Sequence, residues 1–215
     1  MGRYKRFHSL FTRFGRTAYP GGFFRFNETE KTLYLSFDDG PTPEITPWVL
    51  DLLMHYKVPA TFFLIGKNVH SNRELVNRIH KEGHAIGAHS MNHENGWNTS
   101  DKIYIQSIEE SAKLLETSLY RPPYGRIKRA QFKALKTRGY QCVFWDCLSY
   151  DFDTRLDPRK CFETSIQNAK AGSIVVFHDS LKAASRLKNC LPLLIETWLE
   201  EGFTFKTIQA NQIPQ

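Results

Sequence analysis

The sequence predicts an α/β fold in which parallel strands are joined by helices. Short β-branched and aromatic stretches alternate with longer segments of helical periodicity along most of the chain. Acids and histidines follow directly after several of the apolar stretches, as they do at the carboxyl ends of strands in such folds. The 215 residues, 41% of them hydrophobic and 24% charged, suffice for one domain with a substantial core.

Composition and periodicity define the individual elements. Runs of β-branched, aromatic and other apolar residues bounded by turn-forming or polar residues are predicted as strands; they are residues 33–37, 61–65, 85–88, 141–145, 173–177 and 203–208. Segments with apolar residues three and four apart are predicted as amphipathic helices; they are residues 44–56, 73–81, 103–117, 128–138 and 191–200. This alternation favours parallel strands with crossover helices.

Two adjacent acids stand at the end of the first predicted strand. Asp38 and Asp39 lie between that strand and the turn-forming pair Gly40 and Pro41. Adjacent strand residues point to opposite faces, so we expect the two carboxylates to have different roles, one on a metal ion and one on an attacking water. The alternative is an ordinary turn, which Asp, Gly and Pro favour for backbone reasons.

A pair of histidines follows the short strand at 85–88. His89 and His93 are four residues apart, so one helical turn or a tight loop can direct both at one ion. With one of the two acids they form the donor set of a metal site with open positions, which predicts a metal-dependent hydrolase. The alternative is an accidental pair. The remaining histidines have no such neighbours and are expected to be surface or packed side chains: His8, His55, His70, His80 and His84.

Two further segments carry polar groups to the same edge of the sheet. Arg121 precedes two prolines that restrict the backbone, so Arg121 can orient a carboxylate and the Tyr124 amide can donate to an oxyanion. The strand at 173–177 ends at His178, which is followed by Asp179. The alternatives are a proline-rich loop and a capping aspartate beside an imidazole.

Taken in order, these strings resemble the motifs of the polysaccharide deacetylase family, the NodB homology domain shared by chitooligosaccharide, chitin and peptidoglycan deacetylases. The resemblance covers residues 31–208. It implies a distorted, incomplete (β/α) barrel with a metal ion in a groove at the carboxyl ends of the strands. We therefore divide the chain into a basic, aromatic N-terminal arm, 1–27, and a polysaccharide deacetylase catalytic domain, 28–215.

The same resemblance implies a role for each site residue. Asp38 would be the general base, positioned by Arg121, and the backbone amide of Tyr124 would help to bind the oxyanion. His178 would be the general acid that protonates the leaving amine, with Asp151 raising its pKa. The implied metal ligands are Asp39, His89 and His93.

One stretch departs from the family pattern. The family string Asp-Ser-x-Asp-Trp reads here from Leu148 to Phe152, so a leucine replaces the first acid and a phenylalanine replaces the tryptophan. Phe177, where leucine is common, is expected to narrow the pocket for the acetyl methyl group. The side chains expected to form the substrate wall are therefore Trp97, Trp145, Phe152 and Phe177.

The implied activity is metal-dependent removal of N-acetyl groups from an N-acetylglucosamine-containing glycan, either a peptidoglycan fragment or a chitooligosaccharide, with release of acetate. Zinc is the first choice of metal, and cobalt, nickel or manganese suits the same ligands. Two alternatives stay open, an O-acetyl carbohydrate esterase that uses the same site and a non-catalytic glycan-binding descendant. The sequence names neither the glycan nor the oligomeric state.

The net charge of +7 is concentrated in the arm. No acid occurs before residue 27, and the body of the chain is nearly neutral, which argues against a nucleic-acid partner. The arm also has apolar residues at helical spacing: Phe7, Leu10, Phe11 and Phe14. Residues 1–26 are thus expected either to make weak contact with an anionic membrane surface or to pack an aromatic helix face on the barrel.

Cellular location is predicted from absent signals. The chain has no apolar run of about 18 residues, the length of a membrane span. Arg13, Gly15 and Arg16 interrupt the apolar core that a signal peptide needs. The four cysteines show no metal-binding spacing, so free thiols are expected. These observations favour a cytoplasmic or membrane-peripheral protein.

Overall fold

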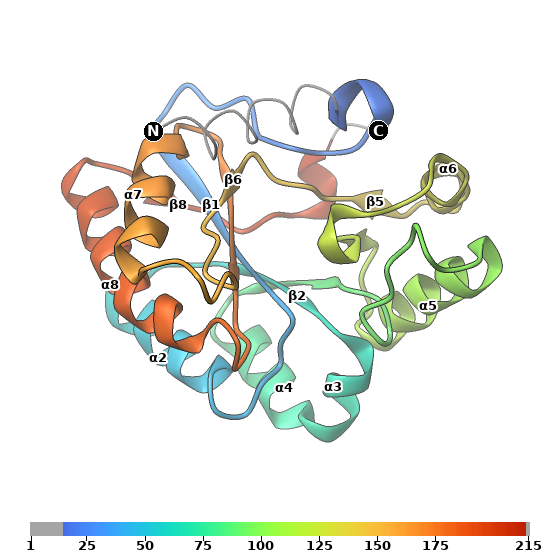
Figure 1. Ribbon diagram of the computed structural model, residues 1–215, viewed down its shortest axis with the longest axis horizontal. Coiled ribbons are helices and arrows are strands. Elements are labelled where there is room, and N and C mark those ends of the chain that lie inside the picture. Colours follow the sequence, from blue (N-terminus) through green and yellow to red (C-terminus); the bar gives the residue numbers. More distant parts are fainter. Residues whose placement is uncertain (1–14, 214–215) are drawn as a thin grey trace.

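The computed structural model describes residues 15–213, which form a curled parallel sheet surrounded by helices (Figure 1). Seven strands follow one another in the order β5-β4-β3-β2-β1-β7-β6, and β8 pairs with β1 off this path. Every pairing between these strands is parallel. The predicted α/β fold with a distorted, incomplete barrel is confirmed.

The strands are short apart from β1 at the centre of the sheet. They are β1 Thr32–Asp38, β2 Thr61–Leu64, β3 Ala85–Ala88, β4 Leu119–Tyr120, β5 Gln141–Cys142, β6 Cys147–Leu148, β7 Ile174–His178 and β8 Thr204–Phe205. β3 has the predicted bounds, whereas β5 and β8 are shorter than the predicted strands. The sequence did not predict β4 and β6, because two residues give no period to detect.

The helices cover the outside of the sheet. They are α2 Thr46–Tyr56, α3 Gly66–Ser71, α4 Arg73–Lys81, α5 Asp101–Leu114, α6 Arg129–Thr137, α7 Pro158–Asn168 and α8 Ala184–Glu200, with short turns η1 Pro123–Gly125 and η2 Ala210–Gln212. Neither α3 nor α7 was predicted from the sequence. The start of α8 was predicted at 191, beside Pro192, but the helix accommodates that proline because its apolar face is buried on both sides of it.

Two apolar clusters divide the core between the faces of the sheet. β1 is buried along its whole length, and alternate residues serve different clusters. Leu33, Leu35 and Phe37 face the helices in the larger cluster. Tyr34 faces the barrel interior in the smaller cluster, which also holds Phe63. The interior face of β1 continues with Ser36 and ends with Asp38, so it changes from apolar to polar towards the carboxyl end.

The segment before β1 closes part of the gap left by the incomplete barrel. Phe23 bridges to Val143 beyond β5, and Arg25 bridges to Ser173 just before β7. Phe24 and Phe26, which the sequence analysis assigned to the arm, lie in the two apolar clusters. The residues proposed for membrane contact or helix packing lie largely outside the described part, which begins at residue 15.

The described residues contain neither a membrane-spanning helix nor a disulfide. Between residues 15 and 213, none of the helices is long and apolar enough to cross a bilayer. The four cysteines are buried free thiols, and those of Cys161 and Cys190 are in contact where α7 packs on α8.

Gly87 allows the Phe63 ring to lie in the barrel interior. The two residues are register partners in β3 and β2, and a Cβ atom added at Gly87 would overlap the Phe63 ring. Gly87→Ala should lower the free energy of unfolding by about 1–3 kcal/mol, because overfilling a packed core forces its neighbours apart. Urea unfolding monitored by tryptophan fluorescence measures this change.

A double-mutant cycle isolates the cause of that loss. In a Phe63→Leu background the ring is gone, so Gly87→Ala should cost clearly less than it does in the parent chain. An equal cost in both backgrounds would show that the destabilisation comes from the backbone of β3 and not from contact with Phe63.

Candidate active site

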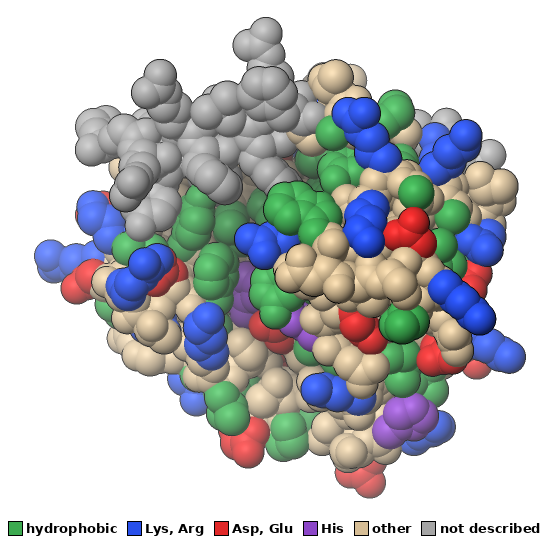
Figure 2. All heavy atoms as spheres, turned by 45° about the vertical axis from the view of Figure 1, so that its right-hand side comes forward, with side chains coloured by type: hydrophobic (Ala, Val, Ile, Leu, Met, Phe, Trp, Pro, Cys, Tyr) green, Lys and Arg blue, Asp and Glu red, His purple; other side chains and the backbone are tan. Residues whose placement is uncertain are grey.

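The candidate site lies at the carboxyl ends of the central strands. Asp38 ends β1 and His178 ends β7, and the two are register partners in adjacent strands. The segments after β3 and β4 bring the other polar side chains to the same edge. Figure 2 shows histidine and acidic side chains recessed in a hollow, with hydrophobic and basic side chains along its edge.

A buried arginine holds Asp38. Arg121 follows β4, is completely buried, and donates from Nη1 to Asp38 Oδ1 at 2.6 Å and to Ser36 Oγ at 2.9 Å. Its Nε donates to the Val143 carbonyl at 3.2 Å, and the guanidinium carbon lies 4.0 Å from the centre of the Phe63 ring. The Asp38 carboxylate is therefore fixed in position by a cation from the inside of the barrel.

Asp39 lies beyond the end of β1 and turns towards the two histidines. Its φ of 82° is in the left-handed region, so the alternation of strand side chains does not apply to it. Asp38 and Asp39 were expected to point to opposite faces because adjacent strand residues do so. This reason does not hold, because Asp39 has left the strand conformation and both carboxylates reach the same end of the barrel. Asn68 donates to the Asp39 carbonyl at 3.0 Å, and Asp179 accepts from the Gly40 amide at 3.0 Å, which holds this turn.

Hydrogen bonds orient the two imidazoles. His89 Nδ1 is 2.9 Å from the Arg121 carbonyl and His93 Nδ1 is 3.1 Å from the Tyr124 hydroxyl, which leaves both Nε2 atoms directed at Asp39. Burial lowers the pKa of His89 to about 4, so its ring is neutral at pH 7. A neutral imidazole is the form that binds a metal.

The donor atoms of Asp39, His89 and His93 fit a divalent cation. One ligand atom from each residue lies within 4.8 Å of the others. Asp39 Oδ1 is buried without a well-formed hydrogen bond, although His93 Nε2 is 3.2 Å away. Burial alone would raise the pKa of Asp39, but His93, His178 and His89 together lower it well below its usual range. A carboxylate oxygen facing two imidazole nitrogens is a donor set that a cation satisfies.

His178 is paired with a buried aspartate. Asp151 Oδ1 lies 2.7 Å from His178 Nδ1, and Asp151 Oδ2 accepts from the His178 amide at 2.7 Å. Burial alone would lower the pKa of His178, but the charge of Asp151 and this hydrogen bond outweigh burial and raise the pKa to about 9. The imidazole therefore carries a proton at neutral pH, with Nε2 free to donate it.

The four residues expected to form the substrate wall have different positions. Trp97 is 55% exposed, and the Phe152 ring lies 5.0 Å from that of His178. Trp145 is half-buried against the interior cluster. Phe177 lines no accessible wall, contrary to expectation, because it faces the helices and stacks on Phe37 with ring centres 5.8 Å apart.

Sequence reasoning missed some contacts of the site. Ser36 supports Arg121, and the signal for it was its place two residues before Asp38, on the same face of β1. For Tyr124 only the amide was considered, yet its exposed side chain contacts His93. Asp179 was taken only as the neighbour of His178, whereas it is buried and accepts hydrogen bonds from Gly40 and Thr46.

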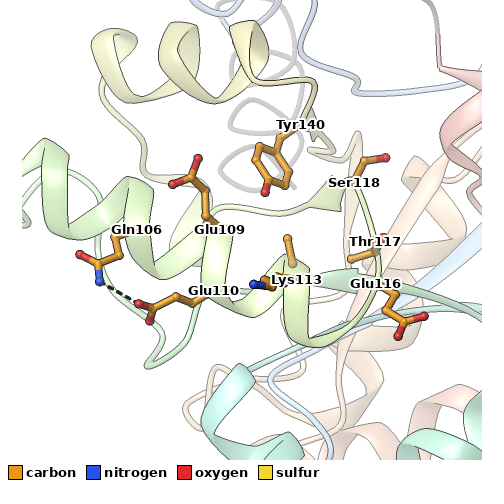
Figure 3. A pocket seen from close by; sticks show the side chains of 9 residues that line it. Gln106, Glu109, Glu110, Lys113, Glu116, Thr117, Ser118 and Tyr140 are labelled. Carbon is orange, nitrogen blue, oxygen red and sulfur yellow. Dashed lines mark hydrogen bonds between the residues drawn. The ribbon is translucent and has the colours of Figure 1, made fainter.

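A separate surface pocket is not this site. It lies over α5 and is lined by the side chains shown in Figure 3, among them Glu109, Lys113 and Tyr140. Gln106 donates to Glu110 at 2.7 Å within it. None of the candidate site residues lines this pocket, and its side chains are those of a solvated helix face.

Comparison with known proteins gives the family. Residues 26–143 match the family model described as polysaccharide deacetylase. The chain is 40% identical over 188 residues to a peptidoglycan-N-acetylglucosamine deacetylase of Bacillus cereus, covering 83% of this chain and 87% of that protein. It is 34% identical over 196 residues to the peptidoglycan-N-acetylmuramic acid deacetylase PdaA of Bacillus subtilis, covering 86% and 73%.

A solved structure agrees with the sequence matches. A peptidoglycan N-acetylglucosamine deacetylase in complex with 4-naphthalen-1-yl-N-oxidanyl-benzamide superposes with a TM-score of 0.82 at 28% identity, covering 87% of this chain and 91% of that one. Fold and sequence together therefore define a hydrolase. The chain belongs to the polysaccharide deacetylase family.

The pairing of His178 with Asp151 gives a testable pH dependence. Asp151→Asn removes the charge that raises the pKa of His178, so this pKa should fall from about 9 and the alkaline limb of the kcat/KM profile should move to lower pH by about one unit or more. Acetate release measured between pH 5 and about 10 tests the shift.

Asp153→Asn is the matched control for this substitution. Asp153 lies close by in the chain but its carboxylate pairs with Arg155, so its removal should leave the alkaline limb in place. An unshifted profile for Asp151→Asn would show that Asp151 does not set the protonation of His178.

Proposed function

We propose that this chain is a metal-dependent hydrolase that removes N-acetyl groups from the N-acetylglucosamine-containing glycan of peptidoglycan and releases acetate. The observation that carries the proposal is the placement of a held carboxylate, Asp38, and a protonated imidazole, His178, at adjacent strand ends beside the cluster of Asp39 and two histidines. The names of the two relatives, both peptidoglycan deacetylases, support this substrate class.

The metal site is assigned to Asp39, His89 and His93. A divalent cation bound there would polarise the amide carbonyl and lower the pKa of a water molecule from 15.7 towards about 7. Zinc is our first choice because two imidazoles and one carboxylate are ligands that it favours in catalytic sites. Cobalt, nickel and manganese suit the same donors, so metal identity is part of the test.

Asp38 is the proposed general base. Its contact with Arg121 fixes the orientation of the carboxylate, and Ser36 accepts a hydrogen bond from the same guanidinium nitrogen. A carboxylate fixed in this way can accept the proton of an attacking water without reorganising. Because Asp38 pairs with Arg121, and Asp39 faces the histidines, base and ligand roles are divided between neighbouring acids.

His178 is the proposed general acid. Amide hydrolysis stalls unless the departing nitrogen receives a proton, because the amine anion is a very poor leaving group. Asp151 keeps Nδ1 of His178 engaged, so the mobile proton is at Nε2. The Tyr124 amide is proposed as a donor to the carbonyl oxygen as negative charge develops on it.

Acetate release from N-acetylglucosamine oligomers and peptidoglycan fragments tests the proposal. Metal-stripped protein should be inactive, reloading with zinc should restore release, and Asp38→Asn should lower kcat by about 10²- to 10⁴-fold while zinc is still bound. Reloading with cobalt, nickel or manganese ranks the metals, and O-acetylated glycans at equal metal loading separate amide from ester hydrolysis.

Two outcomes would contradict this function. The first is no release from any N-acetylated glycan by zinc-loaded protein, and the second is equal release by the Asp38→Asn variant. Because that variant leaves Arg121 buried without its carboxylate, its urea unfolding is measured in parallel. His178→Gln is a second variant, which should lose release for lack of the general acid.

Tyr124→Phe tests how the second histidine is held. The substitution removes only the hydroxyl that contacts His93 Nδ1, and such supporting hydrogen bonds are worth about 10- to 100-fold in metal affinity. Zinc affinity measured by competition with a chromophoric chelator should fall by this factor. Unchanged affinity would show that the loop alone orients His93.

A further inference from the structure

The edge of the site next to His93 carries an arginine between two exposed aromatic rings. The Tyr124 ring centre lies 4.6 Å from that of His93. The guanidinium carbon of Arg126 lies 5.9 Å from the centre of the Tyr124 ring and 5.0 Å from that of Trp97. The three side chains therefore form a continuous row, Tyr124, Arg126 and Trp97, that leads outward from a proposed metal ligand.

The loops that carry this row are joined rigidly. Gly96 donates its amide to the Arg126 carbonyl at 3.1 Å, and Trp97 Nε1 donates to the Ile127 carbonyl at 3.2 Å. A Cβ atom on Gly96 would press against the Arg126 carbonyl and Gln131, so only glycine permits this close approach. The buried amide of Gln131 donates to the Gly96 carbonyl at 2.9 Å. The two loops that carry the row are thus held against each other before any ligand arrives.

Arg126 keeps its charge available. It is exposed, and among residues 15–213 it forms no ion pair. Two acids close to the row in the sequence have other partners, since Asp101 pairs with Lys128 at 3.5 Å and Glu94 accepts from Asn92 in its own loop. Stacking on aromatic faces orients a guanidinium without neutralising it, and leaves its edge free to donate two parallel hydrogen bonds.

We propose that Arg126 is a specificity-determining residue. It binds a carboxylate that the glycan carries near the sugar that is deacetylated, an inference that rests on the proposed function. A planar guanidinium matches a carboxylate with two hydrogen bonds, whereas a neutral N-acetylglucosamine chain offers no such partner. Trp97 and Tyr124 keep the guanidinium in the orientation that this contact needs. The enzyme thereby selects carboxylated over neutral N-acetylated glycans.

Two chemical sources can supply the carboxylate. One is the free carboxyl group of the lactyl ether of a muramic acid residue that carries no peptide. The other is a carboxyl group of the stem peptide, because the lactyl carboxyl group is an amide when a peptide is attached. Kinetics on a peptide-free disaccharide of N-acetylglucosamine and N-acetylmuramic acid, on the same disaccharide bearing a stem peptide, and on neutral N-acetylglucosamine oligomers distinguish them.

Arg126→Gln is the decisive variant. It should reduce the ratio of kcat/KM for the preferred carboxylated substrate to that for the neutral oligomer by about tenfold to a hundredfold, the range of one charge-assisted pair. The loss should fall on KM, because the contact is present before and during the reaction. Arg126→Lys should retain part of the preference, since it keeps the charge but not the planar fork.

Arg129→Gln is the matched control, because it removes the same charge from an exposed arginine of α6 whose guanidinium lies over neither the Tyr124 nor the Trp97 ring. Its substrate ratio should equal that of the parent chain. Raising the salt concentration should weaken the preference of the parent and leave that of Arg126→Gln nearly constant.

Binding separates failure of this inference from failure of the proposed function. If the parent hydrolyses N-acetylated glycans but Arg126→Gln leaves the substrate ratio unchanged, the inference is wrong and the function stands. If no glycan is hydrolysed, calorimetric titration of the carboxylated and neutral glycans decides, and tighter binding of the carboxylated one that depends on Arg126 supports the inference alone. If there is neither hydrolysis nor binding that depends on Arg126, both the inference and the proposed function are wrong.

Discussion

The buried contact between Arg121 and Asp38 is the interaction on which the site and the barrel both depend. A guanidinium removed from water is tolerated only when its donors are satisfied and its charge is paired. Arg121 meets both needs by using Ser36 and Asp38 of β1 and the carbonyls of Val143 and Phe144 beyond β5. Its own carbonyl orients His89. One side chain thus ties several parts of the barrel interior together, and the position of the proposed base is inseparable from the packing of the sheet.

The division of labour between strands and loops follows from this arrangement. Asp38 and His178 sit on strands, where a register contact fixes their separation. The proposed metal ligands sit on segments just after strand ends, and Asp39 and His93 have positive φ. Such conformations cost free energy and persist where the surroundings enforce them, here through Asn68, Asp179 and Tyr124. The proposed general base and general acid are therefore on rigid strands, whereas the proposed metal ligands are on the constrained segments that follow the strands.

Much of the fold was predictable from the sequence, because elements such as β1, β3 and α4 have apolar patterns that are long or clearly bounded by polar or turn-forming residues. β4 and β6 were not, since two-residue strands exist only through their neighbours, and α7 was missed although Asp157 and Pro158 form a good helix start. The short sequence motifs at the ends of the predicted strands indicated which residues could share a site. They could not show that Asp39 leaves the strand conformation, that Phe177 faces the helices, or that Arg126 lies over Trp97, because these depend on backbone angles and on contacts between distant segments.

The way in which residues 23–26 close part of the gap in the incomplete barrel has a consequence for folding during synthesis. This segment leaves the ribosome early, but its partners are the chain beyond β5 and the residues just before β7. β1 likewise sits between β2 and β7, which are far apart in the sequence. Contacts of such high sequence separation form late. The strands synthesised before β7 therefore keep an open sheet edge until β7 has been made, so the central part of the sheet is completed as one unit rather than strand by strand.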